Sequence, residues 1–318
     1  MAIGDIAGLK LGPATRDAFG DAFLELGNQR PEIVCVDADL ANSTMASKFQ
    51  KMHKDRFFSV GIAESNMVGV AAGLADAGKQ AWATSFAVFL MANAYDQIRL
   101  SVAYPGLNVK LVGSHSGISI GPDGPSQMGI EDIALACALP GFTVLVPSDA
   151  AQTIACVKAA ADIPGPVYIR TGRGKTPVLY PADAPFQVGK ANTLREGSDV
   201  TLIACGLTVA LALDAAALLE KEGVSARVMD MASVKPLDED AVAKAAAETH
   251  GIVVVEEHLL DGGLGSRVAM AAAKKHPCRM AFVGMDNQFA ESGSPEDVLR
   301  KYGFTPEHVV DAAKSLLG

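Results

Sequence analysis

The sequence contains few cysteines and no long apolar run. Its five cysteines among 318 residues are scattered and form no CxxC pair, which predicts reduced thiols rather than a disulfide framework. Most of them lie in apolar runs, where a thiol behaves as a small core hydrophobe. No apolar stretch reaches the roughly 18 residues of a membrane span, and residues 1–16 lack the basic and apolar regions of a signal peptide. We therefore expect a cytoplasmic protein without a membrane segment.

Basic residues are also in deficit. The chain carries 27 Lys and Arg against 36 Asp and Glu, which gives a formal charge of −9 at pH 7. Nucleic-acid binding needs a concentrated basic surface, so an acidic balance spread along the chain excludes that class of partner. The length is sufficient for two domains that each bury a core, and 49% of the residues are hydrophobic.

Short β-branched runs alternate with longer Ala-rich helical patterns, which predicts an α/β fold with mainly parallel sheets. A Gly- and Pro-rich passage at residues 171–190 interrupts this alternation, as a domain boundary would. The expected domains are residues 1–180 and 190–318. The expected strands are residues 33–36, 57–60, 80–84, 109–113, 143–146 and 167–170 in the first domain, and 200–204, 226–229, 252–255 and 280–283 in the second.

Glu64 is the first candidate functional residue. It follows a predicted strand and begins a predicted helix of mostly apolar and small residues, in Gly61-Ile-Ala-Glu64-Ser-Asn-Met. One interpretation is an N-terminal acid that the helix dipole favours. The other is a partly desolvated carboxyl that exchanges a hydrogen bond or proton with a buried ligand. This segment alone favours the first interpretation.

Two further segments follow predicted strands. Phe86 and Phe89 lie just beyond residue 84, at the edge where α/β sheets collect ligands, although two Phe at this spacing are more often core. Residues 113–127 contain four glycines and two prolines and predict an irregular loop. Long loops in compact domains are often functional. This loop carries the polar residues His115, Asp123, Ser126 and Gln127.

Two arginines and a serine complete the candidates. Arg16 lies near the start of the first predicted helix, and Ser43 lies in a loop after a strand. Arg170 ends the last strand of the first domain, where a guanidinium suits a phosphate group. Taken singly, each is equally an ion-pair or capping residue.

The order of these segments resembles the carboxyl-terminal half of transketolase, over nearly the whole chain. GPDGPSQMGIED is the most specific stretch, and GIAESNM is shared more widely among thiamine diphosphate enzymes. TRDAFG, YIRTGR and ESGSPEDVLRKYGF continue the resemblance. It implies a pyrimidine-binding domain followed by the carboxyl-terminal domain of that family.

The resemblance also implies roles for the candidates. Glu64 would hydrogen-bond N1′ of the thiamine aminopyrimidine and stabilise the imino tautomer, whose 4′ nitrogen removes the C2 proton of the thiazolium. Glu64 and His115 are thus the expected catalytic residues. Phe89 would stack on the pyrimidine with Phe86 beside it, and Gln127 would face the active site. The expected substrate ligands are His115 and Asp123 for the sugar hydroxyls, and Arg16, Ser43 and Arg170 for the acceptor phosphate.

The sequence departs from the family in two respects. It has one residue more between Phe89 and Asp96, and Asn93 stands where Arg is common. It also lacks the Gly-Asp-Gly segment and the following Asn that hold the diphosphate and its metal; Asp261-Gly-Gly-Leu-Gly predicts only a turn into a helix. We therefore expect no metal ligands in this chain. Thiamine diphosphate, with Mg²⁺ or Ca²⁺, would bind against a separate amino-terminal subunit in an α2β2 heterotetramer, with the helix after Glu64 at an interface.

The leading functional hypothesis is the second subunit of a two-chain transketolase. It would move a two-carbon ketol group from a ketose phosphate to an aldose phosphate. One alternative keeps the cofactor and changes the substrate, as in a specialised-sugar transketolase or a 1-deoxyxylulose-5-phosphate synthase-like enzyme. Another is a non-catalytic assembly subunit, which loss of Glu64, Phe89 or Asp123 would indicate, and all three are present.

Overall fold

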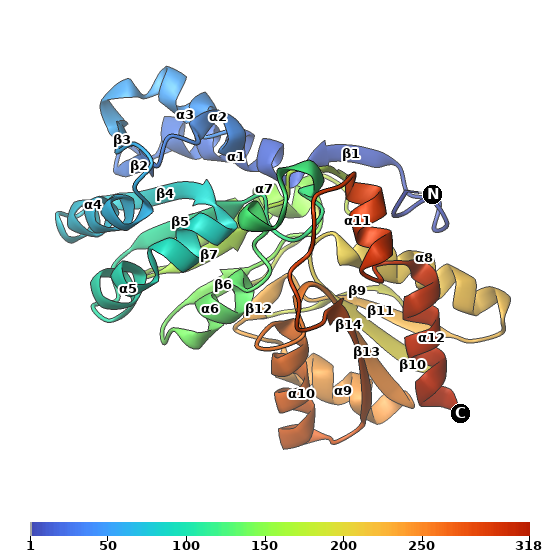
Figure 1. The fold of residues 1–318 in the computed structure, drawn as a ribbon. Coiled ribbons are helices and arrows are strands. Elements are labelled where there is room, and N and C mark those ends of the chain that lie inside the picture. Colours follow the sequence, from blue (N-terminus) through green and yellow to red (C-terminus); the bar gives the residue numbers. More distant parts are fainter. Residues whose placement is uncertain (1) are drawn as a thin grey trace.

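A seven-stranded sheet forms the centre of the first domain (Figure 1). The computed structural model describes residues 2–318. The strand order is β12-β6-β7-β5-β4-β2-β3, and every pair is parallel except β12 with β6. The strands are β2 (Ile33–Asp37), β3 (Phe57–Ser59), β4 (Gln80–Phe86), β5 (Val109–Ser114), β6 (Thr143–Leu145), β7 (Val167–Arg170) and β12 (Ser233–Lys235).

Helices cover both faces of this sheet because its strands are apolar on both sides. In β2, Ile33 and Cys35 join one core cluster, whereas Val34 and Val36 join another. The first cluster packs against α1 (Thr15–Gln29), α3 (Ser47–Met52) and α7 (Ala150–Asp162). The second packs against α4 (Glu64–Asp76), α6 (Asp132–Ala138) and the π-helical segments η2 (Phe89–Asn93) and η3 (Ile98–Ala103), which flank α5 (Tyr95–Gln97).

Short elements lie in the connections of the first domain. They are α2 (Ala41–Thr44) and the 3₁₀ turns η1 (Lys54–Arg56), η4 (Gly121–Asp123) and η5 (Pro125–Gln127). A separate two-stranded sheet pairs β1 (Leu11–Ala14) with β8 (Lys175–Pro177).

The second domain is built on a five-stranded sheet in the order β14-β13-β10-β11-β9, parallel except for β9. Its strands are β9 (Asn192–Arg195), β10 (Val200–Ala204), β11 (Ala226–Asp230), β13 (Gly251–Leu259) and β14 (Arg279–Met285). One face packs against α8 (Thr208–Lys221), α11 (Pro295–Lys301) and α12 (Pro306–Leu317), and the other against α9 (Glu239–Glu248) and α10 (Leu264–Lys275).

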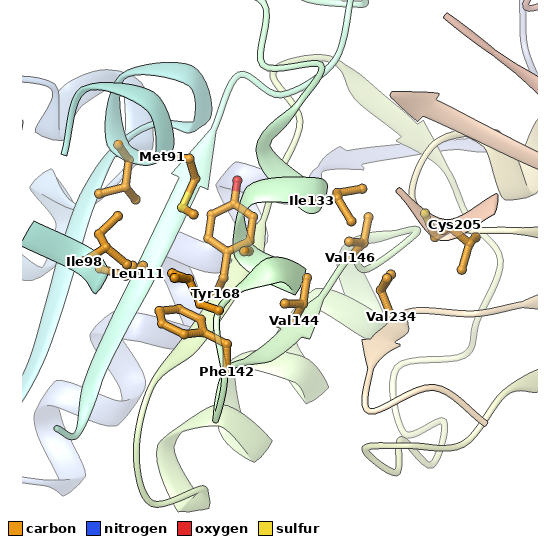
Figure 2. Close-up of a cluster of buried hydrophobic side chains, with 14 of the residues drawn as sticks. Met91, Ile98, Leu111, Ile133, Phe142, Val144, Val146, Tyr168, Cys205 and Val234 are labelled. Carbon is orange, nitrogen blue, oxygen red and sulfur yellow. The ribbon is translucent and has the colours of Figure 1, made fainter. Parts of the chain in front are cut away.

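The two domains share one apolar core. Figure 2 shows Tyr168 and Val144 of the first domain in the same cluster as Cys205 and Val234 of the second. Val234 lies in β12, which the second domain contributes to the edge of the seven-stranded sheet by pairing with β6. The domains are therefore joined by a sheet as well as by packing.

The α/β prediction is confirmed, and all ten predicted strands are present within a few residues of the expected positions. Strands β7 and β10 have the predicted bounds, whereas β4 continues to Phe86 and so includes a residue that was expected beyond it. Strands β1, β8, β9 and β12 were not predicted, because these short segments contain Gly, Pro or polar residues in place of an apolar β-branched run. All five cysteines are free thiols. Among the helices of residues 2–318, none has the length and apolarity to cross a membrane.

Candidate active site

The candidate residues meet at the carboxyl ends of adjacent parallel strands, where open α/β sheets bind ligands. His115 follows β5, Phe86 ends β4, and Ser43 lies in α2 after β2. Arg16 reaches the same edge from the first turn of α1. The order β5-β4-β2 thus brings together residues far apart in the sequence.

Arg16 links Ser43 to His115. Its Nη1 donates to the carbonyl oxygen of Ser43 at 3.0 Å and lies 3.2 Å from Nε2 of His115. A guanidinium cannot accept a hydrogen bond, so Nε2 is the acceptor and the imidazole proton is on Nδ1. Nδ1 then donates to Oγ of Ser114 at 2.7 Å. The contacts fix both the orientation and the tautomer of His115.

His115 is both strained and neutral. Its φ of 56° lies in the left-handed region. For a residue other than Gly this backbone conformation costs about 1–3 kcal/mol, and such strained residues cluster at functional sites. Burial, reinforced by the charges of Arg16 and Arg173, lowers the pKa of His115 to about 3. The imidazole is therefore uncharged at physiological pH, with Nε2 accepting from Arg16 and Nδ1 donating to Ser114.

The rings of His115, Phe86 and Phe89 form a row. The imidazole of His115 stacks on Phe86 with centroids 3.8 Å apart and planes 18° apart. Phe86 stacks in turn on Phe89, at 5.6 Å and 12°. Phe86 is buried, whereas Phe89 is half-buried at the start of η2. The row therefore offers a flat, partly exposed aromatic surface.

Glu64 lies at the same edge as the aromatic pair. It begins α4, as predicted, and its side chain is buried. Oγ of Ser85 donates to Oε1 at 3.0 Å, and Nδ2 of Asn93 donates to Oε2 at 3.2 Å. Ser85 immediately precedes Phe86 in β4. The burial and the two side-chain donors go beyond what a solvated helix-terminal acid would show, which was the interpretation favoured by the local sequence alone.

The loop after His115 carries the remaining polar candidates. Asp123 pairs with Arg173 at 3.4 Å, and Arg173 also donates to the carbonyl oxygen of Ile120 at 2.9 Å. Gln127 is half-buried, and its Oε1 accepts from Ser126 at 2.6 Å. Sequence reasoning did not select Arg173, although it lies in the same YIRTGR motif as Arg170.

Arg170 lies apart from this group. Its Nε donates to Oδ2 of Asp132 at 2.8 Å, and its Nη2 donates to Oδ1 of Asp132 and to the carbonyl oxygens of Gly129 and Glu257. Asp132 thus occupies the two guanidinium donors of Arg170 that the sequence predicts for a phosphate. Both side chains are buried, so this is an internal ion pair that also contacts the second domain.

A cavity of about 510 Å³ lies between the domains. Thr15, Ser116 and Gly172 line it, and these are chain neighbours of Arg16, His115 and Arg173. Its lining does not include Glu64, Phe86 or Phe89, so these three residues do not belong to the cavity wall. Residues 2–318 hold no group of three or more His, Cys, Asp or Glu side chains placed to bind a metal ion.

The chain matches two family models in sequence. Residues 12–178 match the pyrimidine-binding domain of transketolase, and residues 189–309 match the transketolase carboxyl-terminal domain. These matches correspond to the two sheet-centred domains described above.

Individual relatives agree with these matches. A putative transketolase C-terminal section of Methanocaldococcus jannaschii is 39% identical over 92% of this chain and 93% of its own length. An apulose-4-phosphate transketolase subunit from Phocaeicola vulgatus is 38% identical, with coverages of 94% and 96%. The chain also matches longer transketolases, of which it spans about half.

A solved structure gives the same result. A split-gene transketolase, described as an inactive β4 tetramer, superposes with a TM-score of 0.90 at 47% identity, covering 96% of this chain and 99% of that one. The chain therefore belongs to the transketolase family and consists of its pyrimidine-binding and carboxyl-terminal domains.

Proposed function

We propose that this chain is the second subunit of a two-chain transketolase that transfers a two-carbon ketol group between phosphorylated sugars. The observation that carries the proposal is the buried carboxyl of Glu64 at the sheet edge that also holds the Phe86–Phe89 pair. A carboxyl beside an aromatic platform suits a heteroaromatic ring that needs a hydrogen bond at one nitrogen.

The residues at this edge fit the aminopyrimidine of thiamine diphosphate. Glu64 would hydrogen-bond the ring nitrogen N1′ and thereby control the protonation of the ring. The half-buried ring of Phe89 would stack on the pyrimidine, with Phe86 behind it and Gln127 facing the site. Bound thiamine diphosphate supplies the nucleophilic carbon of the reaction. We assign its diphosphate group, and the Mg²⁺ or Ca²⁺ that accompanies it, to a partner subunit.

Arg16 and Arg173 are our candidates for the phosphate of the substrate. Burial lowers the pKa of the Arg16 guanidinium, and the like charge of Arg173 contributes to that shift. An anion placed near both side chains would relieve this repulsion. Ser43 contacts Arg16, His115 contacts the same guanidinium, and Asp123 pairs with Arg173. In this proposal His115 and Asp123 would meet the sugar hydroxyls. Of the predicted phosphate ligands, Arg170 is the one whose donors Asp132 largely occupies.

The proposed partner is an amino-terminal transketolase subunit in an α2β2 assembly. Relatives that are described as transketolase subunits and match this chain over most of their length support a second chain. The surface around α4 and η3 supports a place for it. Ile62, two residues before α4, is 84% exposed, Tyr104, just after η3, is 89% exposed, and Gly69 and Gly73 of α4 face open space. Apolar and small residues of this kind allow close approach of another chain. Light scattering of the chain alone and with its partner tests the assembly, and a monomer in both cases would contradict it.

Ketol transfer in a reconstituted complex tests the function. The purified chain is combined with an amino-terminal subunit, thiamine diphosphate and Mg²⁺, and ketol transfer to an aldose phosphate is followed. We expect activity that Glu64→Gln reduces by about 10²-fold or more, because the amide cannot exchange a proton with the ring. Glu25→Gln, a change in an exposed helix residue, is the matched control. Undiminished activity of the Glu64→Gln complex would contradict the catalytic assignment.

A substrate panel separates the enzyme hypotheses. The relative described as an apulose-4-phosphate transketolase subunit supports testing branched and modified sugars beside the common ketose phosphates. Transfer from only one such donor would identify a specialised transketolase. Activity only with pyruvate as donor would instead favour a 1-deoxyxylulose-5-phosphate synthase-like reaction. A complex that binds no thiamine diphosphate would favour a non-catalytic assembly subunit.

A further inference from the structure

The end of β13 lies along the loop that carries the polar candidates. Three successive residues of this strand contact the first domain. Glu257 Oε1 accepts from the backbone N–H of Ser119 at 2.5 Å, His258 Nε2 accepts from Ala134 N–H at 3.3 Å, and Leu259 N–H donates to the carbonyl oxygen of Ile130 at 2.7 Å. The second domain thus contacts the stretch of residues 119–134 at three places, namely residues 119, 130 and 134, rather than at one point.

Glu257 makes the central contact of this set. Its side chain is buried, and its backbone carbonyl accepts from Nη2 of Arg170 at 2.9 Å. Asp132 in turn fixes Arg170 from the first domain. Glu257 therefore binds the loop through its carboxylate, and Arg170 binds the backbone carbonyl of Glu257. A buried carboxylate that accepts a backbone N–H forms a charge-assisted bond, which is stronger than a neutral one.

The loop backbone approaches the second domain too closely for side chains at two glycines. Gly117 has a φ of 73°, and a Cβ there would collide with the Glu257 carboxylate. Gly121 also has a φ of 73°, and a Cβ there would lie 2.9 Å from Cδ of Pro295 and 3.0 Å from the carbonyl oxygen of Gly293. Glycine is needed at both positions because of this approach and the left-handed backbone.

The loop held in this way carries Asp123 and Gln127, and Arg173 also binds it through Ile120 and Asp123. We propose that Glu257 of the carboxyl-terminal domain is a positioning residue for the active site, which acts by fixing the loop of residues 116–127 through the Ser119 N–H. This rests on the proposed function for its catalytic consequence. The structural consequence, an ordered loop, is independent of it.

Two sets of groups belong to different parts of the site. Glu64 is bonded by Ser85 and Asn93, and neither of these lies in the loop of residues 116–127. Gln127 is the one proposed neighbour of the cofactor in this loop, so loosening the loop should weaken sugar binding more than thiamine diphosphate binding. If Glu257 merely stabilised the fold, its substitution would weaken sugar binding and thiamine diphosphate binding to the same extent.

Hydrogen–deuterium exchange of the full-length chain tests the structural part. In Glu257→Ala, we expect amides of residues 116–127 to exchange about tenfold faster, because Ser119 N–H loses its acceptor. Glu257→Gln should restore protection, since an amide oxygen accepts the same hydrogen bond. Asp199→Ala removes another carboxylate of this domain, which accepts from Ser225 N–H, and should leave the loop unchanged. If the Ala variant is insoluble, Glu257→Leu removes the acceptor with less loss of volume.

Kinetics of the reconstituted complex test the catalytic part. We expect Glu257→Ala to raise KM for the aldose phosphate about tenfold, with kcat and the Kd for thiamine diphosphate each within about threefold of wild type. Unchanged loop exchange in the acceptor-free variants, or equal loss of sugar and cofactor binding, would overturn the proposal. Faster loop exchange with no ketol transfer in the wild-type complex would instead leave the positioning role intact and overturn the proposed function.

Discussion

A neutral histidine is the residue on which the candidate site is organised. His115 accepts from Arg16, stacks on Phe86 and is held in one tautomer by Ser114. Arg16 and Arg173 oppose any positive charge on the ring. Its backbone is left-handed, and its imidazole stacks on Phe86, the last residue of β4. The sequence indicated that His115 mattered but could not indicate its charge state, which depends on burial and on residues distant in the chain.

The low pKa of His115 predicts a loss of stability in acid. The native pKa is about 3, below the unfolded value of 6.5, so the unfolded chain binds one more proton between these values. The free energy of unfolding should therefore fall as the pH drops below 6.5, by at most about 1.4 kcal/mol per pH unit from this group. Denaturant titrations at pH 7, 6 and 5 should show a smaller slope for His115→Gln than for wild type. Parallel slopes would show that His115 is not the source.

The buried Arg170–Asp132 pair predicts a large effect of a single substitution. Arg170→Met should lower the free energy of unfolding by about 3–5 kcal/mol, because Asp132 is then buried without its partner. Arg30→Met breaks the exposed pair with Asp162 and should cost about 1 kcal/mol or less. Chemical denaturation measures both. Equal effects of the two substitutions would contradict the burial argument.

At the scale of the element, the π-helical segment η2 accounts for the departure seen between Phe89 and Asp96. A π turn accommodates one more residue than an α-helical turn, and such turns are frequent at functional sites. It begins at Phe89, which belongs to the aromatic row, and ends at Asn93, which binds Glu64. The π turn that accommodates the additional residue thus also places the Asn93 amide against the Glu64 carboxyl.

Removing that amide should weaken cofactor binding. We expect Asn93→Ala to raise the Kd for thiamine diphosphate about fivefold in the reconstituted complex, because one of the two donors that orient Glu64 is lost. Calorimetric titration measures the affinity, and Gln29→Ala on exposed α1 is the control. An affinity equal to that of wild type would show that Ser85 alone suffices to hold the carboxyl.

The elements also show what the sequence could predict. Strands β7 and β10 are rich in β-branched residues, and their bounds follow from the local pattern alone. Strand β12 has only three residues and depends on β6, which lies almost ninety positions earlier, so no local pattern marks it. The same limit applies to the choice between Arg170 and Arg173. Both lie in one motif, and only the position of Asp132 in space decides which guanidinium is occupied.

At the scale of the molecule, the two domains share one apolar core. The core cluster in Figure 2 runs from Met91 of the first domain to Cys205 of the second. Polar contacts reinforce this core. Asp230 in β11 accepts hydrogen bonds from Ser148 of the first domain and from Tyr180 of the segment that joins the two domains. The interface that fixes the active-site loop is thus part of the core of the protein.

We expect calorimetry of the chain to show a single unfolding transition. Val234→Asp, at a fully buried position of β12, should lower the free energy of unfolding of the whole chain by about 3 kcal/mol or more, because it places a charge in the shared core. Val178→Asp, at a position that is 45% exposed, should change stability by about 0.5 kcal/mol or less. Two separate transitions in the wild-type chain would contradict the shared core.

Strand β12 also has a consequence for how genes of this kind can be divided. A break in the coding sequence between the two family domains would leave the seven-stranded sheet without its edge strand and expose β6 to pairing with foreign strands. Neither product would keep the loop of residues 116–127 against β13. The pair of domains should therefore be inherited, fused or exchanged as one piece, even though sequence comparison recognises it as two.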